Sequence, residues 1–356
     1  MNMEYPPTYP MVLNGCAHWM REPGTDNSIN FAFKKGFTGP PWLEVMRWRP
    51  EDSFQTPETV AKFKPTKFSY MHSFSITENH VVFLFYPVKV DPKKFPASNF
   101  HAFETFEGNR SDSTDVFVVN LKSGDVKGPF STDYAYSAHH INAYEKSEEE
   151  IVLDWCPTPF ENMREYLKLE NMLNPPETFD PESVTTTGGV EVTRFTINTK
   201  EGTVKSEEFP NTINSKFVNN FDFPTINEEY RGRKYCITYG MAAFAYSRVA
   251  IVKKNVCDPD KDEVFYRENH YFGEAHFLPT PGLTLIKYAK MIKRTNFDGT
   301  KEKSYLLLMD AKSFTPINTA YLPHHIPWSA HGMYFPEANF KMPNVKVKSK
   351  MKKEEL

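Results

Sequence analysis

The chain has 356 residues, of which 40% are hydrophobic and 15% aromatic, enough to bury one large core or two ordinary ones. A formal net charge of -3 at pH 7 excludes the broad basic surface of a nucleic-acid-binding protein. No apolar run is long enough to span a bilayer, and the first ten residues lack the apolar region of a signal peptide. The four cysteines include no closely spaced pair, so we expect a reducing compartment and a cytoplasmic protein.

Short runs of β-forming residues follow one another along the chain, separated by turn residues. Thirty phenylalanines, 28 prolines and 16 glycines are typical of many short strands and many turns. We predict strands in five runs: residues 81–90, 116–121, 194–198, 249–256 and 305–310.

Four of these strands look like copies of one unit. They end near Asn120, Asn198, Asn255 and Asp310, and a turn and a more polar strand follow each of them. Loose repetition of this kind is typical of a β-propeller, in which every blade is a small antiparallel sheet that needs its neighbours. A β-sandwich would give similar strands but fewer repeated units, so the pattern favours a propeller.

One helix and one tail interrupt this pattern. Residues 158–161 read Thr-Pro-Phe-Glu, a capping box with proline at the first helical position. An apolar stripe follows it, and we expect a single inserted helix that packs over a sheet. Residues 341–356 form a basic tail, which we expect to be disordered; attraction to a membrane surface is the alternative. The folded domain is therefore predicted over residues 1–340.

Three histidines far apart in sequence precede blade-like units. His72, His139 and His331 each lie beside aromatic or small residues. Radial sheets bring their inner strands to one axis, so imidazoles from several blades can meet there. The pattern predicts that these three hold one metal ion; the alternative is three unrelated buried histidines.

Five segments resemble the motifs of the carotenoid cleavage oxygenases, in the same order. They are Ser-Tyr-Met-His-Ser-Phe at residues 69–74, Ala-His-His-Ile-Asn-Ala-Tyr-Glu at 138–145, Phe-Asp-Phe-Pro-Thr-Ile-Asn at 221–227, Gly-Glu-Ala-His-Phe at 273–277 and Ala-His-Gly at 330–332. The resemblance covers most of the chain. It implies a seven-bladed propeller with iron(II) on its axis, four histidine ligands, three carboxylates that orient them, and a hydrophobic tunnel for a polyene.

The motifs assign His72, His139 and His331 as ligands, with Asp222 and Glu274 as carboxylates behind them. Asp222 stands where the family has glutamate, and the missing methylene could break its bond to a ligand histidine or leave a gap for a water. The family's first ligand lies in an Ala-His-Pro motif. An alignment anchored on residues 29–33 places Tyr9, in Thr-Tyr-Pro, at that position.

That alignment puts His18 on the following strand, where we expect it to be unrelated to the metal. Family members also have a segment before the first ligand, which carries at least one blade and one of the three carboxylates. The propeller is therefore expected to be incomplete at the N-terminus.

The resemblance predicts a non-haem iron(II) dioxygenase that cleaves a carbon–carbon double bond of a carotenoid or apocarotenoid with molecular oxygen. The alternative is a catalytically impaired carotenoid- or retinoid-binding relative, because Tyr9, Asp222 and the short segment before the first ligand depart from the pattern. A retinoid isomerohydrolase and a metal-free interaction propeller are further alternatives. A lipophilic substrate would also favour peripheral membrane contact. A serine hydrolase is disfavoured because no GxSxG elbow is present, and no phosphate-binding or dinucleotide glycine signature occurs.

Overall fold

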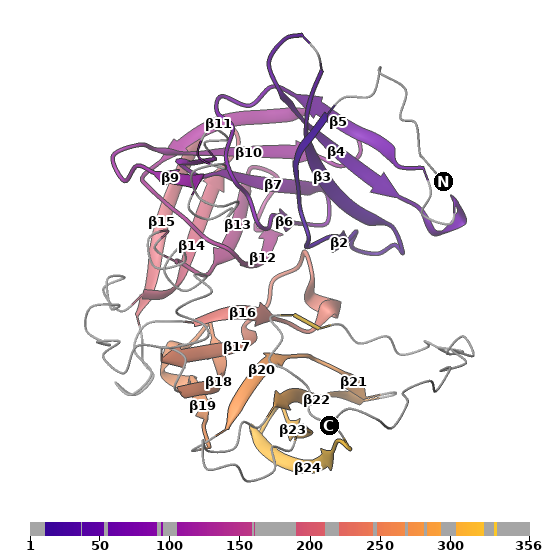
Figure 1. The fold of residues 1–356 in the computed structure, drawn as a ribbon, viewed down its shortest axis with the longest axis vertical. Coiled ribbons are helices and arrows are strands. Elements are labelled where there is room, and N and C mark those ends of the chain that lie inside the picture. Colours follow the sequence, from indigo (N-terminus) through magenta and orange to yellow (C-terminus); the bar gives the residue numbers. More distant parts are fainter. Residues whose placement is uncertain are drawn as a thin grey trace, which may run out of the picture.

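The computed structural model describes residues 11–36, 38–52, 56–90, 94, 105–158, 160, 190–210, 221–244, 248–267, 270–280, 283–292, 304–323 and 331–332. Within them, the regular structure is almost entirely β (Figure 1). Short 3-10 helices lie in connections, among them η1 (Pro50–Asp52), η4 (Glu228–Tyr230) and η6 (Pro259–Lys261). No helix in this part of the chain is long and apolar enough to cross a membrane.

The first half of the chain builds two antiparallel sheets and a ribbon. The first sheet has the order β1-β3-β4-β5, with β2 beside β3: β1 (Met11–Gly15), β2 (Met20–Arg21), β3 (Ser28–Lys35), β4 (Trp42–Trp48) and β5 (Glu58–Phe63). The second has the order β11-β10-β7-β6: β6 (Ser75–Ile76), β7 (His80–Phe85), β10 (Thr114–Asn120) and β11 (Val126–Thr132). The ribbon pairs β8 (Val88–Val90) with β9 (Phe106–Gly108).

The described residues between 140 and 321 build three further sheets. The third contains β12 (His140–Glu145), β13 (Glu150–Trp155), β14 (Val190–Asn198) and β15 (Thr203–Pro210). The fourth contains β16 (Phe221–Thr225), β17 (Ile237–Phe244), β18 (Arg248–Asn255) and β19 (Glu263–Phe265). The fifth contains β20 (Tyr271–Ala275), β22 (Leu283–Ile292), β23 (Ser304–Asp310) and β24 (Thr315–Tyr321), with β21 (Pro279–Thr280) beside β22.

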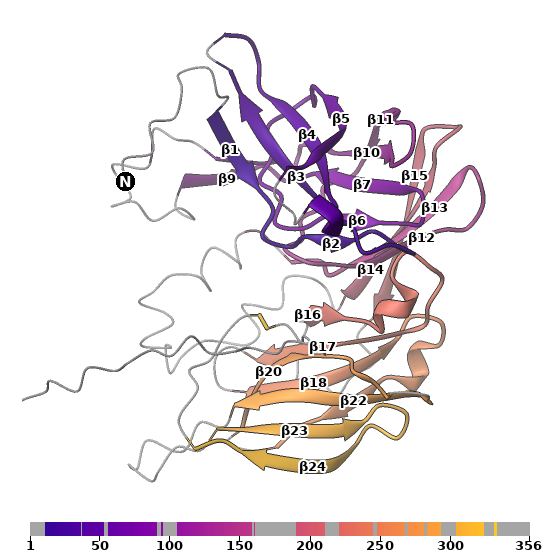
Figure 2. The ribbon, with the colours of Figure 1, turned by 90° about the vertical axis from the view of Figure 1, so that its right-hand side faces the viewer.

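The sheets follow one another around an arc, and each pair of neighbours shares an apolar core (Figures 1 and 2). Between the first two sheets the core is rich in phenylalanines. The rings of Phe31 and Phe83 have centroids 5.4 Å apart, and those of Phe33 and Phe85 are 5.8 Å apart, both edge to face. Sheets that are buried on facing sides and follow in chain order are the arrangement of a propeller. The predicted all-β, propeller-type class is confirmed.

The four repeated strand endings seen in the sequence share one hydrogen-bonded turn. The side-chain oxygen of Asn120, at the end of β10, accepts the backbone N–H groups of Lys122 and Ser123, both at 2.9 Å. Asn198, Asn255 and Asp310 accept the corresponding two N–H groups after β14, β18 and β23. A side chain that caps its own turn ends the strand and starts the next one. The interpretation of these four positions as copies of one unit is therefore confirmed.

The other expectations about the fold lie mostly outside the described residues. Of the predicted helix, Phe160 is described, helical and buried in the core between the second and third sheets. The basic tail at residues 341–356 is not described. The division into a domain and a tail and the number of blades stay predictions.

Glu145, at the end of β12, links the third sheet to the turn before β7 through hydrogen bonds. Its carboxylate accepts hydrogen bonds from the hydroxyl of Thr77 at 2.6 Å and the side chain of Asn79 at 2.8 Å, and it contacts Nδ1 of His80 at 2.9 Å. Burial would raise the pKa of Glu145, but these hydrogen bonds outweigh it and lower the pKa to about 2.

Because the pKa of the Glu145 carboxyl is lowered, the stability that these hydrogen bonds contribute depends on pH. This contribution to stability is fully present above the ordinary glutamate pKa and is lost as pH falls from there through about 2. Glu145→Gln should therefore unfold at lower urea concentration than the wild type at pH 6, and the difference should shrink toward pH 2.5. Glu148→Gln, at an exposed position in the next turn, should unfold at the same urea concentration as the wild type at both pH values. A difference in urea midpoint between Glu145→Gln and the wild type that does not change with pH would contradict this role of Glu145.

The third sheet contains a buried ion pair, and a tyrosine hydroxyl links this pair to the fourth sheet. The carboxylate of Asp154 on β13 accepts hydrogen bonds from Nε and Nη2 of Arg194 on β14 at 2.7 and 2.8 Å, and from the hydroxyl of Tyr235 at 2.8 Å. Tyr235 precedes β17, so the hydroxyl reaches across from the fourth sheet. The Asp154 side chain is completely buried, which makes its three hydrogen bonds essential to offset the loss of water.

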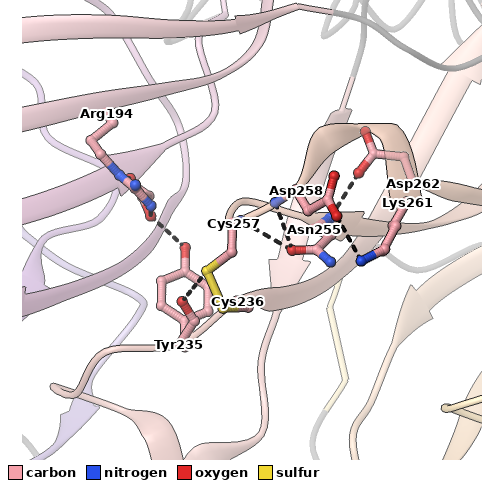
Figure 3. The surroundings of a disulfide bond; sticks show 9 residues. Arg194, Tyr235, Cys236, Asn255, Cys257, Asp258, Lys261 and Asp262 are labelled. Atoms are coloured by element: carbon pink, nitrogen blue, oxygen red, sulfur yellow. Dashed lines mark hydrogen bonds and ion pairs between the residues drawn. A yellow bond between two sulfur atoms is a disulfide. The ribbon is translucent and has the colours of Figure 1, made fainter.

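A disulfide between Cys236 and Cys257 lies beside this network (Figure 3). Register explains the pairing: Ile237 on β17 lies opposite Asn255 on β18, so the cysteines meet just beyond the strand ends. Sequence spacing alone did not predict this pair. Disulfides are rare in reducing compartments. This pair therefore argues against the cytoplasmic location expected from the cysteine count, and that location stays a prediction.

Candidate metal centre

Four imidazoles converge on one point: those of His18, His72, His139 and His331. One nitrogen from each lies within 4.8 Å of the other three. Nε2 of His18 is 2.9 Å from Nε2 of His72, and Nε2 of His139 is 3.3 Å from Nε2 of His331. Imidazole nitrogens facing one another across a few ångströms form the donor set that zinc, copper, iron or nickel binds. The three histidines predicted from sequence do come together, and a fourth joins them.

The four histidines come from four separate parts of the fold. His18 lies in the connection between β1 and β2, and His72 lies between β5 and β6. His139 directly precedes β12, and His331 follows the fifth sheet. All four sit in or beside connections, which frees each ring to point at a common centre while the sheets fix its position.

The expectation for His18 was wrong. It was expected on a strand, away from the metal, but it lies in a connection and its ring centroid is 4.5 Å from that of His331. Tyr9, expected at the fourth position, lies outside the described residues. One signal could have found His18: Ala17-His18 keeps two residues of the Ala-His-Pro motif, with exposed Trp19 in place of proline.

Carboxylates hold two of the imidazoles from behind. Nδ1 of His139 is 2.6 Å from Oδ1 of Asp222, and Nδ1 of His331 is 3.2 Å from Oε1 of Glu274. Glu274 also accepts the backbone N–H of Gly332 at 3.0 Å. A carboxylate at Nδ1 keeps the proton there and turns the lone pair of Nε2 toward the centre. Asp222 and Glu274 therefore lie where the sequence motifs placed them.

The shorter Asp222 keeps its hydrogen bond because the local backbone brings it close. The pairing of β16 with β17 shifts register after Asp222, and Phe223 has a φ of 54°, a conformation that costs energy for a bulky residue. Gly240 on β17 lets the strands approach: a Cβ there would lie 2.8 Å from the carbonyl oxygen of Asp222. The missing methylene therefore does not break the contact.

Burial and mutual repulsion keep the imidazoles of His18 and His72 neutral at pH 7. Burial and the neighbouring histidines lower the pKa of His18 to about 3 and that of His72 to about 4. Burial also lowers the pKa of His139, but Asp222 outweighs it and raises that pKa overall. Burial would raise the pKa of Asp222, and His139 holds it below its ordinary value. Neutral rings offer the free lone pairs that a metal ion needs.

Two further residues stabilise the segments that carry the ligands. His140 points away from the centre, with Nδ1 2.9 Å from the hydroxyl of Ser75 and Nε2 2.7 Å from that of Tyr86. The first histidine of the pair is therefore the one at the centre, as the motif implied. The thiol of Cys16 donates to the carbonyl oxygen of His72 at 2.9 Å and accepts the N–H of His18 at 3.3 Å. It ties two ligand-bearing connections together.

Comparisons with known proteins agree with this geometry. A family model described as "Retinal pigment epithelial membrane protein" matches residues 3–336. A mitochondrial carotenoid-cleaving dioxygenase of Macaca fascicularis is 23% identical over 325 residues, which cover 80% of this chain and 57% of that protein. A beta,beta-carotene 15,15'-dioxygenase of Mus musculus is 24% identical over 299 residues, which cover 76% of this chain and 51% of that protein. The chain thus spans little more than half the length of these relatives.

Solved structures show the same fold. The crystal structure of cobalt-substituted Synechocystis apocarotenoid oxygenase aligns with a TM-score of 0.67 at 19% identity, covering 90% of this chain and 64% of that one. A mutant of the same enzyme, in which glutamine replaces a glutamate, aligns with a TM-score of 0.68 at 20% identity. This alignment covers 90% of this chain and 64% of the mutant chain. The propeller-type fold, the order of the motifs and the family match over most of the chain agree. This protein belongs to the carotenoid cleavage oxygenase family.

Proposed function

We propose that the protein is a non-haem iron(II) dioxygenase that cleaves a carbon–carbon double bond of a carotenoid or apocarotenoid. The four-histidine cluster carries this proposal. The named activities of the relatives support the substrate class, and the cobalt named for a solved apocarotenoid oxygenase structure supports the metal site. The substrate class and the metal are assigned to this chain through the family and the fold that it shares with these proteins.

The residues of the cluster fit iron(II). Four imidazoles provide nitrogen donors without thiolates, and the carboxyl groups of Asp222 and Glu274 lie close behind two of them. When bound, iron(II) supplies the activation of dioxygen toward a carbon–carbon double bond. The protein's own part is to orient the rings, hold protons at the outer nitrogens and keep water away.

An aromatic side chain lines one side of the cluster. The ring of Phe223 lies 5.0 Å from that of His139 and 5.2 Å from that of His331. This ring limits the access of water and offers an apolar surface to a polyene. We propose that Phe223 is one wall of the substrate site.

The alternative of a catalytically impaired binding protein loses its residue-level support. It rested on Tyr9 in place of a ligand and on a broken contact at Asp222. His18 supplies a fourth imidazole, and Asp222 keeps its hydrogen bond. Peripheral membrane contact and action on retinoids stay predictions.

Iron loading and product analysis test the proposed function. Purified protein reconstituted with iron(II) without oxygen should hold about one iron per chain. With air and β-carotene or an apocarotenal in detergent micelles, it should release aldehydes that carry oxygen from labelled dioxygen. The same protein without iron should give no product. Stoichiometric iron with no product from either polyene would contradict the proposal.

A further inference from the structure

The disulfide between Cys236 and Cys257 lies at the surface. Cys257 is exposed and Cys236 is partly exposed, whereas the other two cysteines, Cys16 and Cys156, are buried. Thiol–disulfide exchange requires that a thiolate reach one of the two bonded sulfurs. An exposed cysteine leaves this bond within reach of a dissolved thiol while the chain stays folded.

The two strands that the bond joins do not depend on it for their pairing. β17 and β18 pair along their whole length, eight residues each. Beyond the strand ends, the backbone N–H of Val256 donates to the carbonyl oxygen of Cys236 at 2.8 Å. The sheet therefore stays intact around reduced cysteines, and their sulfurs remain close enough to pair again.

Each cysteine adjoins a residue of the core between the third and fourth sheets. Tyr235 precedes Cys236 and Val256 precedes Cys257, and both are buried in that core. The sulfur of Cys257 lies 3.5 Å from the carbonyl oxygen of Tyr235 (Figure 3). The hydroxyl of Tyr235 donates to Asp154 on the third sheet at 2.8 Å. The oxidised pair therefore restrains the backbone of the residue that links the two sheets.

We propose that the Cys236–Cys257 pair is a thiol–disulfide switch that sets how firmly the third and fourth sheets are joined. In the oxidised form, the sulfur–sulfur bond keeps Tyr235 in place, with its hydroxyl on Asp154. In the reduced form this restraint is lost, so the hydroxyl is on the carboxylate for a smaller fraction of the time.

A dithiol reduces the bond in two exchange steps. One thiolate of the reductant attacks the exposed sulfur of Cys257, and Cys236 leaves as a thiolate. The second thiolate of the reductant then attacks the mixed disulfide and releases Cys257. The protein gains two thiols and the reductant becomes a disulfide, so two electrons and two protons are transferred. A disulfide of the same class reverses both steps.

The core beside the switch extends to the histidine cluster. It includes Ile141, two residues after His139, and Phe221, which precedes Asp222. The 2.6 Å contact between Nδ1 of His139 and Oδ1 of Asp222 spans the same two sheets. A looser joint weakens this contact, so reduction should lower the affinity of the cluster for a metal ion. This consequence rests on the proposed metal site, whereas the switch itself does not.

Thiol trapping of metal-free, folded protein tests whether the pair can switch. The protein is equilibrated in mixtures of reduced and oxidised dithiothreitol, alkylated and analysed by mass spectrometry. Cys236 and Cys257 should become alkylated together as the mixture becomes more reducing, and should be protected again on reoxidation. Cys16 and Cys156 should stay unmodified because they are buried. A pair that is reduced only in urea, or that does not form again, would overturn the switch.

Urea unfolding of the metal-free protein tests the link to the third sheet. Reduction should lower the urea midpoint of the wild type, and the shift should be smaller in Tyr235→Phe, which has no hydroxyl to hold on Asp154. Tyr239→Phe is the matched control on β17, because its hydroxyl bonds the carbonyl oxygen of Ala311. Its shift should equal that of the wild type. An equal shift in Tyr235→Phe would make the disulfide a simple cross-link and overturn the inference.

Cobalt binding tests the consequence for the histidine cluster. The double variant Cys236→Ser, Cys257→Ser represents the reduced state without thiols that could themselves bind cobalt. Its cobalt(II) affinity, followed by visible absorption, should be about 5-fold or more below that of the oxidised wild type. Equal affinity would overturn the effect on the cluster. A wild type that binds no cobalt would refute the proposed metal site, whereas the trapping and urea results would still decide the switch.

Discussion

Replacing His18 with alanine should abolish stoichiometric iron binding. The ring supplies one of four converging nitrogens, and its Nε2 lies 2.9 Å from that of His72. Removing a ligand should cost more than the roughly 10–100-fold that the loss of an outer partner costs. Iron per chain after reconstitution, and cobalt titration of the metal-free protein, measure the effect.

Tyr9→Phe is the informative comparison for this experiment. The sequence alignment placed Tyr9 at the fourth ligand position, whereas the structure brings His18 there. We expect Tyr9→Phe to bind iron like the wild type. Full binding by His18→Ala together with loss in Tyr9→Phe would restore the sequence-based assignment and contradict the structural one.

Replacing Asp154 with asparagine should destabilise the protein by about 3–5 kcal/mol, the range seen when one partner of a buried ion pair is removed. The change leaves the Arg194 guanidinium, whose side chain is 17% exposed, without its countercharge between the third and fourth sheets. Urea unfolding of metal-free protein at pH 7 gives the free energy of unfolding for both forms.

An exposed ion pair provides the matched control. Glu149 pairs with Lys200 at 2.7 Å, but their side chains are 49% and 71% exposed. Glu149→Gln should change the free energy of unfolding by less than about 1 kcal/mol, because water already solvates both groups. Equal effects at Asp154 and Glu149 would mean that the Asp154 network does not join the sheets as described.

Features that depend on local chemistry could be predicted from sequence. Asn120 and Asp310 end their strands by capping their own turns, so the repeat was readable from the residues themselves. His72, His139 and His331 were found because each lies in a distinctive motif. His18 was missed because tryptophan replaces the proline that marks its motif.

Features that depend on distant contacts could not be predicted in this way. The pairing of Cys236 with Cys257 follows from the register of β17 and β18, which sequence spacing does not reveal. Tyr235 reaches Asp154 from another sheet, 81 residues away. Tyr70 lies within a recognised motif, but only the fold shows that its hydroxyl meets Nδ1 of His72.

X-ray absorption spectroscopy of the iron(II)-loaded protein tests the central claim most directly, with His18→Ala measured alongside. The account predicts one iron per chain with four imidazole nitrogens around it in the wild type. Any iron that remains in His18→Ala should show fewer imidazoles. A wild-type shell with three imidazoles, or a shell that does not change in His18→Ala, would contradict the four-histidine centre.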